Sequence, residues 1–454
     1  MKKYRFLSVL LLIPLMLSLV LPANAAGQDD LNLFCTHAVL LDAEHGEVLY
    51  DMKANEQAYP ASTTKIMTAL LVMEAIELGQ LSADTVVTVS ETAVRGIPSG
   101  YITGSFKPGE NISVEDLLYC MMLESDCDAS NILAEAVDGT IEEFVAHMNR
   151  KAGGMGCQGT HFTNTYGLHS EDHYSTAYDL ALMMQAALEY DLFRTVIKTG
   201  SYTVPATNLS KERFFYNKNA LISHNYYRGY VYDKCIGGKT GTTDDAGRCL
   251  VAAAEDGDEL LISVVLGSGP MPVPGESELK QGQFRESRRL LEYGFDNFQR
   301  VTITKDNEPV DKVAVTMSRQ ADEVNVKAQG SITRTLPKSM DLDDIETRIT
   351  LFSDTVEAPV EEGQVMGTMT LSYNGEVYGT LDLVAVTSVE RSELLYQKEQ
   401  FLSFFQTSGM QLLLAAVLLL AAGVLLRLLV FRKKRRPKAG AGANSRGNYR
   451  GGRR

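Results

Sequence analysis

The sequence lacks several features that would place its function elsewhere. Its histidines and cysteines show neither an H-E-x-x-H motif nor the Cys/His spacing of a zinc site, so we expect no metal and no cofactor. Basic residues are outnumbered, with 43 Lys and Arg against 57 Asp and Glu, and every acidic residue lies between residues 26 and 426. This stretch would repel nucleic acid, which excludes a nucleic-acid partner for it.

Cysteine is scarce, and the six residues impose no disulfide framework. Their spacing does not favour one pairing over another. A chain of 454 residues can bury a core without disulfide bonds. We therefore expect unpaired, buried thiols at Cys35, Cys120, Cys127, Cys157, Cys235 and Cys249.

Two apolar runs stand apart from the rest of the chain. The first, residues 7–21, follows three basic residues and precedes small residues that end at Ala25, which predicts a signal peptide cleaved after Ala25. The second, residues 410–431, is long enough to cross a bilayer. The basic run 432–436 indicates a cytoplasmic C-terminus. We expect a single-pass protein of the cell membrane with its main body on the extracytoplasmic side.

The sequence pattern of that main body changes near residue 299. Before this point helical and strand patterns alternate, and after it short alternating runs are split by Gly, Pro, Asn and Asp, which indicates an all-β domain. The expected divisions are a signal peptide (1–25), a mixed helix and strand domain (26–298), an all-β domain (299–389), a helical stalk (390–409), a transmembrane helix (410–431) and a basic tail (432–454).

Periodicity predicts the elements of the mixed domain. Strands are expected at residues 36–50 (a pair around a turn), 85–90, 101–106, 199–205, 235–254 (a second pair) and 260–266. Helices are expected at residues 60–74, 114–122, from near 128, from near 174, and at 282–297.

A serine and a lysine begin the first of these helices. Ser62 and Lys65 are three residues apart, so both lie on one helix face. A serine hydroxyl becomes a good nucleophile when a neighbouring base takes its proton, and a buried lysine amine can do so. This S-x-x-K pattern is weak alone, because Ser277 and Lys280 repeat it in a stretch that reads as a solvated loop or helix start.

Two later stretches can supply partners for this pair. Ser125 lies in a short turn between two apolar helices, where its hydroxyl can face a cleft, and Asp128 is placed to cap the second helix. The K-T-G triplet at residues 239–241 lies inside a strand pattern, where Gly241 allows close approach to the backbone. Another K-T-G, at residues 198–200, reads as an ordinary helix end.

The order S-x-x-K, S-D-x, K-T-G resembles that of penicillin-binding proteins and class A β-lactamases. Longer matches, at residues 60–71, 128–130, 173–179 and 239–247, resemble the low-molecular-mass penicillin-binding proteins that are serine-type D-alanyl-D-alanine carboxypeptidases. The resemblance covers about residues 30–400. It implies a β-lactamase/transpeptidase-like α+β fold, with an antiparallel sheet flanked by helices, followed by the small all-β domain and the C-terminal transmembrane helix.

The resemblance also implies roles for particular residues. Ser62 would attack the carbonyl between the two terminal D-alanines of a peptidoglycan stem peptide, Lys65 would take its proton, and Ser125 would help to protonate the leaving D-alanine. The terminal carboxylate would be held by Lys239, Thr240 and Thr242, with Gly241 and Cys127 also lining the substrate site. Pentapeptides would be trimmed, crosslinking limited, and β-lactam antibiotics bound covalently.

One residue departs from the pattern of the family. Cys127 stands where asparagine is usual, and a thiol replaces an amide's hydrogen bonds only weakly. This leaves a D,D-transpeptidase, or a non-catalytic penicillin-binding wall scaffold, as alternatives. A β-lactamase is less well matched, because no E-x-x-L-N stretch lies between Cys127 and Lys239.

Overall fold

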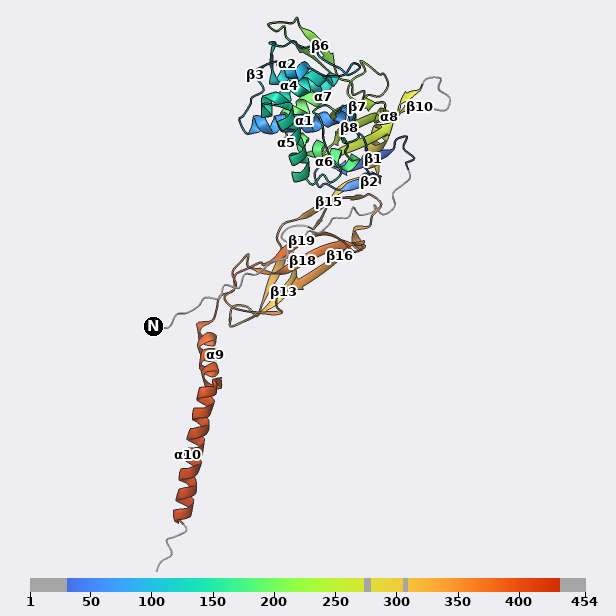
Figure 1. The fold of residues 1–454 in the computed structure, drawn as a ribbon. Coiled ribbons are helices and arrows are strands. Elements are labelled where there is room, and N and C mark those ends of the chain that lie inside the picture. The colour runs from blue at the N-terminus through green and yellow to red at the C-terminus, as the bar shows by residue number, and fades with distance from the viewer. Residues whose placement is uncertain (1–30, 273–278, 305–308, 433–454) are drawn as a thin grey trace, which may run out of the picture. The chain divides into compact units, whose positions relative to one another are not determined.

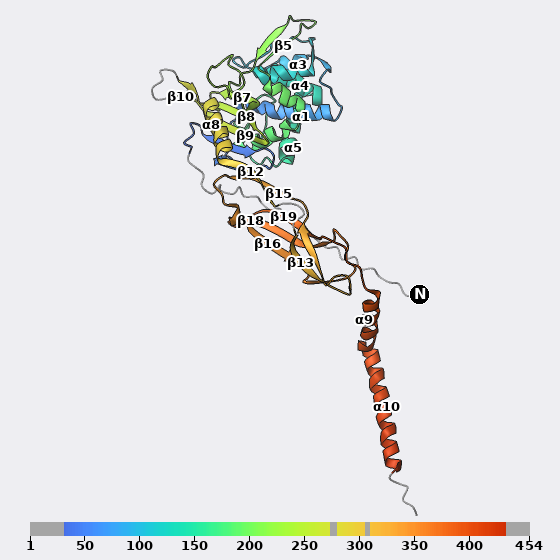
Figure 2. The same cartoon turned by 180° about the vertical axis from the view of Figure 1, so that it is seen from behind.

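The computed structural model describes residues 31–272, 279–304 and 309–432 (Figures 1 and 2). The expected signal peptide, Ser277 of the second S-x-x-K pattern and the tail beyond residue 432 lie outside these ranges. The chain divides into two compact units. The first consists of residues up to Thr304 with Ile332–Glu346 and Ser372–Tyr378, and the second of Lys305–Ser331, Thr347–Leu371 and Gly379 onward.

An antiparallel sheet of five strands organises the first unit. Its order is β2-β1-β9-β8-β7, so the chain's earliest strands pair with its later ones. The paired strands predicted at residues 36–50 and 235–254 are confirmed, as is the strand at 260–266. The strands are β1 (His37–Asp42), β2 (Val48–Met52), β7 (Cys235–Thr243), β8 (Gly247–Asp256) and β9 (Glu259–Ser268).

Both faces of this sheet are buried, which explains why its strands are rich in apolar residues. On one face Val39 and Val251 join the large helical core, whereas on the other Leu40 and Leu250 join the cluster that includes α8 (Gly282–Asn297). Helix α8 lies across strands β8 and β9 (Figure 2). The sheet is therefore the middle layer between helices, as the predicted fold class requires.

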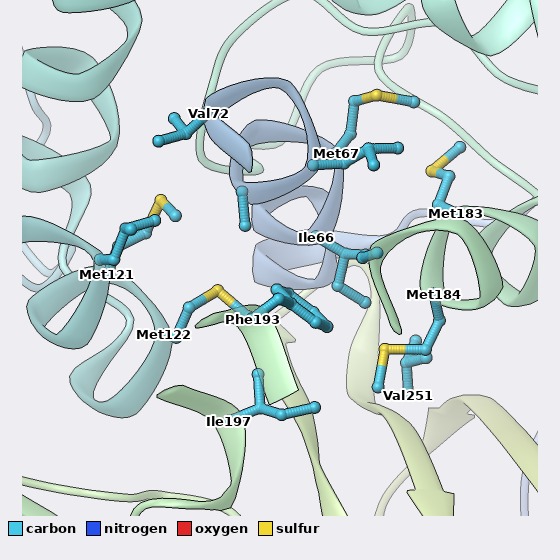
Figure 3. Close-up of a cluster of buried hydrophobic side chains, with 14 of the residues drawn as sticks. Ile66, Met67, Val72, Met121, Met122, Met183, Met184, Phe193, Ile197 and Val251 are labelled. Atoms are coloured by element: carbon cyan, nitrogen blue, oxygen red, sulfur yellow. The ribbon is translucent and has the colours of Figure 1, made fainter. Parts of the chain in front are cut away.

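Helix α1 (Lys65–Glu77) is the centre of the helical layer. Ten of its thirteen residues are buried, because helices surround it on several sides. Figure 3 shows Ile66, Met67 and Val72 of this helix among methionines and Phe193. The helices that contact it include α4 (Cys127–Asp138), α5 (Ile141–Gly154), α6 (Ala177–Leu188) and α7 (Asp191–Lys198). Helices α2 (Glu91–Val94) and α3 (Val114–Tyr119) pack against α4.

The structure corrects several predicted boundaries. The first predicted helix begins as a 3-10 turn, Ala61–Thr64, and becomes α-helical only at Lys65. The helix predicted over 114–122 ends at Tyr119 and continues as a π turn, Cys120–Glu124. Residues 101–106 form no strand, because Ile102 accepts a hydrogen bond from the Cys127 amide instead of pairing with a strand. The cap of α4 is Asp126 rather than Asp128.

Three further pairs of short strands belong to the first unit. Each forms a two-stranded sheet of its own, separate from the five-stranded sheet. These are β3 (Val86–Thr88) with β4 (Asn111–Ser113), β5 (Ser201–Val204) with β6 (Arg213–Tyr216), and β10 (Pro270–Met271) with β11 (Lys280–Gln281).

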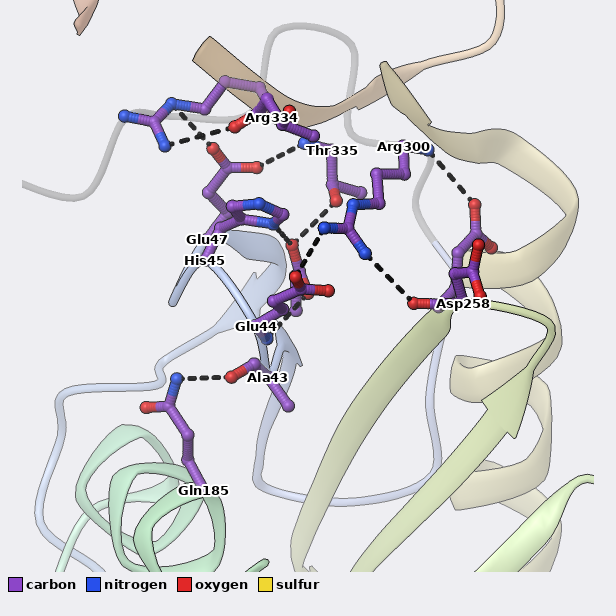
Figure 4. Close-up of polar contacts among 12 residues, drawn as sticks. Ala43, Glu44, His45, Glu47, Gln185, Asp258, Arg300, Arg334 and Thr335 are labelled. Carbon is purple, nitrogen blue, oxygen red and sulfur yellow. Dashed lines mark hydrogen bonds and ion pairs between the residues drawn. The ribbon is translucent and has the colours of Figure 1, made fainter. Parts of the chain in front are cut away.

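A two-stranded ribbon, β12 (Phe298–Thr304) with β15 (Ile332–Pro337), also belongs to the first unit. It contacts the turn between β1 and β2 (Figure 4). The Thr335 amide donates to Glu47 at 2.8 Å and its hydroxyl donates to Asp42 at 2.7 Å, while Arg334 forms an ion pair with Glu47 at 3.1 Å. The ribbon is thus held by polar contacts to the first hairpin of the five-stranded sheet.

The second unit is built mainly of strands, as its alternating sequence predicts. Its six-stranded sheet has the order β16-β18-β19-β14-β13-β17 and a core that includes Val313, Val326 and Leu383. The strands are β13 (Pro309–Thr316), β14 (Glu323–Ala328), β16 (Glu346–Leu351), β17 (Thr355–Glu357), β18 (Val365–Tyr373) and β19 (Glu376–Ala385).

Two helices end the described chain. Helix α9 (Glu393–Gln406) lies within residues 390–409. Helix α10 (Ser408–Arg432) follows, and its residues Ser408–Phe431 are long and apolar enough to cross a membrane.

Candidate active site

Ser62 lies in a strained turn at the start of α1. Its neighbour Ala61 has a positive φ of 47°, a conformation that costs a residue with a side chain some energy. Gly167 packs against this turn, so closely that a Cβ built on it would lie 1.9 Å from the Ala61 carbonyl oxygen. The turn is held in place by surrounding structure, and Ser62 remains partly exposed there.

Lys65 is buried and its amine faces Ser62. Its Nζ lies 3.0 Å from Ser62 Oγ, 2.8 Å from the Tyr166 carbonyl oxygen and 3.7 Å from Cys127 Sγ. Burial lowers the pKa of the Lys65 amine, although Cys127 and Asp126 oppose this shift. A buried amine within hydrogen-bond distance of a serine can accept that serine's proton.

The middle motif brings Ser125 and Cys127 to the same place. Ser125 ends the π turn in a left-handed conformation with φ of 69°, and its hydroxyl is buried without a hydrogen-bond partner among the described residues. Cys127 begins α4, and burial raises the pKa of its thiol. The thiol is therefore protonated near neutral pH and contacts Lys65 as a weak, neutral partner.

Strand β7 brings the third motif to the cleft. Lys239 is buried, and its Nζ donates to the Thr240 carbonyl at 2.9 Å. Burial, together with Lys65 and Lys218 nearby, holds the pKa of Lys239 well below its usual value. A Cβ built on Gly241 would lie 2.9 Å from the Ser62 amide nitrogen, so β7 approaches the serine backbone closely. The hydroxyl of Thr242 donates to the Gly241 carbonyl at 2.7 Å.

Sequence reasoning missed the loop that carries Tyr166. The Asn164 carboxamide oxygen accepts from the Gly167 amide at 2.7 Å and the Leu168 amide at 2.9 Å, which folds the loop tightly. His173 accepts from the Thr163 amide at 3.1 Å, and burial lowers the pKa of His173 to about 4, so it is neutral. In the sequence, Asn164 and Gly167 are the residues that indicate this turn. The contact between the Tyr166 carbonyl and Lys65 joins residues far apart in the sequence, so no local pattern marks it.

The structure thus brings together all three predicted motifs. Ser62, Lys65 and Cys127 are linked by direct contacts, and Gly241 packs on the serine turn. The other K-T-G triplet lies where α7 ends and is not part of this cleft, in agreement with its interpretation as a helix end. Among the described residues, no cluster of three or more His, Cys, Asp or Glu side chains is arranged to hold a metal.

A serine beside a buried amine, on a helix packed against an antiparallel sheet, defines the class of serine acyl-transfer enzymes. Family models narrow this class. The model for D-alanyl-D-alanine carboxypeptidase matches residues 23–269, and that for the C-terminal domain of penicillin-binding protein 5 matches residues 298–391. The chain belongs to the D-alanyl-D-alanine carboxypeptidase family, and is a low-molecular-mass penicillin-binding protein as its sequence predicts.

Individual relatives agree with this assignment. The D-alanyl-D-alanine carboxypeptidase DacF of Bacillus subtilis is 34% identical over 86% of this chain and 95% of its own length. The crystal structure of penicillin-binding protein 5 from Haemophilus influenzae is 27% identical, with a TM-score of 0.63 over 80% of this chain and all of that chain.

A third relative bears on the middle motif. A DD-transpeptidase from Streptomyces is 28% identical over 58% of this chain and 98% of its own, with TM-scores of 0.51 and 0.50 for two variants. One variant changes a serine to alanine, and the other changes a cysteine two positions later to asparagine. Ser125 and Cys127 have the same spacing.

Proposed function

We propose that this chain hydrolyses the terminal D-Ala-D-Ala bond of peptidoglycan stem peptides through a Ser62 acyl-enzyme. The observation that carries the proposal is the 3.0 Å contact between Lys65 Nζ and Ser62 Oγ, beside which Gly241 of β7 packs on the Ser62 backbone. Such an arrangement suits an uncharged acyl carbon next to an anionic chain end, which Lys239 is placed to attract.

The chemistry follows from these positions. Ser62 Oγ bonds to the carbonyl carbon while its proton passes to Lys65, and the Ser62 and Thr242 amides stabilise the oxyanion. The bond to the terminal D-alanine then breaks, and its nitrogen takes a proton by way of Ser125. Water hydrolyses the resulting ester and restores the Ser62 hydroxyl. Lys239, Thr240 and Thr242 hold the substrate carboxylate until the terminal D-alanine, which carries it, departs.

β-Lactam antibiotics would acylate the same serine. Like the peptide, they present an acyl carbon beside a carboxylate, and theirs lies in a strained ring. The experiment is D-alanine release from a diacyl-D-Ala-D-Ala peptide by the full chain in detergent, with fluorescent penicillin labelling in parallel. Ser62→Ala should abolish both, and Ser82→Ala, in an exposed turn, should change neither. Labelling that survives in Ser62→Ala would contradict the site assignment.

A second candidate is D,D-transpeptidation, which the Ser125 and Cys127 spacing favours. The Streptomyces K15 structure that carries a cysteine at this spacing is named a DD-transpeptidase, whereas the curated relative from the same strain is named a D-alanyl-D-alanine carboxypeptidase. Addition of glycine as an acceptor amine distinguishes the two: a product with glycine in place of D-alanine would exceed the hydrolysis product if transfer dominates.

The cellular placement is also a proposal. Residues 1–25 act as a cleaved signal, and α10 anchors the protein so that the catalytic unit meets the wall outside the membrane. The long apolar helix Ser408–Phe431 supports this topology. Protease added to intact spheroplasts should digest the catalytic unit, and protection of that unit would contradict the proposed orientation.

A further inference from the structure

The turn that contains Ser125 is hydrogen-bonded to Lys218, which lies far from it in the sequence. We propose that Lys218 is a positioning residue for Ser125, and that it acts by binding the carbonyl and carboxylate of Glu124. The inference rests on the proposed function, because it assigns the alignment of the residue that is to protonate the leaving group.

Ser125 needs such support for two reasons. Its left-handed backbone, with φ of 69° and ψ of 35°, is uncommon for a residue with a side chain and persists only where surroundings impose it. Its hydroxyl has no hydrogen-bond partner among the described residues, so its own side chain does not fix its direction. The position of Ser125 Oγ therefore depends on the backbone of Glu124 and Ser125.

Lys218 makes three contacts with that backbone and with Glu124. Its amide donates to the Leu123 carbonyl at 3.1 Å, and its Nζ donates to the Glu124 carbonyl at 2.8 Å. The same Nζ lies 3.1 Å from a Glu124 carboxylate oxygen. Both partners are largely buried, with side chains 23% and 15% exposed, so these bonds are shielded from water. One lysine thus binds both carbonyls that precede Ser125.

Lys218 is itself held by its neighbours. The Asn217 side chain donates to the carbonyls of Ile197 and Thr199, and its oxygen accepts from the Asn219 amide at 2.9 Å. This fixes the backbone on both sides of Lys218 to the catalytic unit. The bonds from Lys218 to Leu123 and Glu124 therefore start from a backbone that is held in place on both sides.

The other Glu124 carboxylate oxygen is also occupied. It accepts from the Tyr216 amide at 3.3 Å and from the Tyr226 hydroxyl. Glu124 would otherwise place a negative charge beside Ser125, close to where an anionic substrate is to bind. Lys218 neutralises this charge as well as aligning the turn, and a test must separate the two effects.

The variants that separate them are Lys218→Met, Lys218→Arg and the double variant Lys218→Met with Glu124→Gln. Each is made in the full chain and tested for peptide hydrolysis and for the rate of acylation by penicillin. Lys218→Met should lower kcat and the acylation rate by about 10- to 100-fold, because small misplacements of an acid–base group have effects of this size. KM should change less than twofold, and Lys218→Arg should restore most of the rate.

The double variant decides between alignment of the turn and neutralisation of the Glu124 charge. It removes the Glu124 charge that Lys218→Met leaves uncompensated. It does not restore the bond to the Glu124 carbonyl, so its kcat should stay low. Lys234→Met serves as the control, because Lys234 pairs with Asp256 on the surface at 2.6 Å, and it should behave as wild type. If Lys218→Met fails to fold, Tyr226→Phe tests the alignment of the same turn, because the Tyr226 hydroxyl donates to the Glu124 carboxylate. The expected loss in kcat is about two- to fivefold.

Three results would overturn the proposal. Unchanged kcat in Lys218→Met would show that the bonds from Lys218 are not needed. Full recovery in the double variant would show that Lys218 acts only by neutralising Glu124. A rise in KM with unchanged kcat would make Lys218 a substrate-binding residue. Failure of the proposed function is distinguishable, because the wild-type chain would then release no D-alanine at all.

Discussion

Two lysines of the site are fully buried, yet the proposed mechanism asks opposite things of them. Lys65 must be neutral to take a proton from Ser62, whereas Lys239 must be charged to hold a carboxylate. Burial lowers the pKa of both amines. For Lys239 an incoming carboxylate would restore the charge, because an opposite charge nearby favours the ionised form. Substrate binding would thus return the positive charge to Lys239. Lys65, whose pKa is lowered, is neutral down to a lower pH than a surface lysine.

This difference predicts how acylation depends on pH. A lysine acts as a base only after it loses its proton, so the penicillin acylation rate should rise with pH through the pKa of Lys65. Because burial lowers that pKa from its ordinary value of 10.5, the midpoint of the rise should lie below pH 10.5. Rates measured from pH 5 to pH 10 test this.

Lys65→Arg serves as the matched variant for that profile. Arginine keeps the positive charge and cannot lose its proton, so acylation should fall by at least about 100-fold at every pH. An arginine variant that still acylates with the wild-type profile would show that another group is the base.

The thiol of Cys127 is a second feature that can be tested at the residue scale. Its sulfur lies 3.7 Å from Lys65 Nζ, whereas an amide oxygen would accept a stronger hydrogen bond from the same amine. Cys127→Asn should therefore keep or raise the D-alanine release rate, by up to about tenfold. Activity is measured with and without glycine as acceptor. A large loss would mean that the thiol has a role in catalysis or in acyl transfer.

At the scale of elements, local patterns predicted most of the fold. Short apolar runs separated by turn residues identified β1, β2, β7, β8 and β9, and the apolar residues after Lys65 identified α1. The π turn at Cys120–Glu124 was not predictable, because its sequence continues the helical pattern of α3 and only packing ends the helix at Tyr119. The loop beside Lys65 was missed because its decisive contact joins residues 101 positions apart.

The predicted motifs were found because their side chains carry chemistry that local structure rarely needs. Their neighbours in space, such as Tyr166 and Lys218, contribute through backbone contacts or through a turn, and no sequence pattern marks such contacts. The cap of α4 shows the same limit: Asp126 and Asp128 are both good capping residues, and only the backbone of Asp126 is extended.

Gly167 offers a test of the turn that holds Ser62. It has φ of 90°, and a Cβ there would lie 1.9 Å from the Ala61 carbonyl oxygen and 2.8 Å from the Ser62 amide nitrogen. Gly167→Ala should therefore displace the serine turn and reduce penicillin acylation by about 100-fold. Gly156→Ala is the control, because it has φ of 83° but no atom within 4 Å. Equal effects on acylation in both variants would show that backbone strain alone is responsible.

Asp126 offers a test of how the cap of α4 depends on pH. Its Oδ1 accepts from the Ala129 amide at 3.0 Å, while its buried Oδ2 has no partner among the described residues. Burial raises the pKa of Asp126 to about 7 from 3.8. Because the folded pKa is the higher one, the stabilisation is complete below pH 3.8 and is lost as pH rises through about 7.

Asparagine caps a helix as well as aspartate does and cannot ionise. Asp126→Asn should therefore be more stable than wild type at pH 8, with a smaller difference at pH 4. Urea unfolding at the two pH values measures this. A variant that loses stability equally at both would show that the ionised carboxylate is not the source of the pH dependence.

At the scale of the whole molecule, the chain order and the compact units do not coincide. The first unit recruits Ile332–Glu346 and Ser372–Tyr378 from the later half of the sequence. Every residue proposed for catalysis lies between Ser62 and Thr242, so none of these recruited segments carries chemistry. Their contribution should be to stability, which can be separated from activity.

Truncation after Asn297 makes this separation, since it removes β12 and β15 while keeping α8 complete. The fragment loses the bonds from Thr335 to Glu47 and Asp42 and the bond from the Lys338 amine to the Phe295 carbonyl at 2.7 Å. Such hydrogen bonds are worth about 1 kcal/mol each, and the ribbon's buried Phe298 and Leu336 add about 2 kcal/mol each at most.

The expected result is a fragment, residues 26–297, that is active at 20 °C but melts about 5 to 15 °C below a chain ending at residue 390. The Streptomyces relative matches only 58% of this chain, which supports the expectation that a catalytic unit of this kind can fold without the second unit. Melting is followed by circular dichroism, and D-alanine release is measured on the same samples. An unchanged melting temperature would show that the ribbon's contacts with the β1–β2 turn contribute nothing to stability. A fragment that is stable but inactive would contradict the placement of all catalytic residues between Ser62 and Thr242, because the recruited strands would then be needed for chemistry.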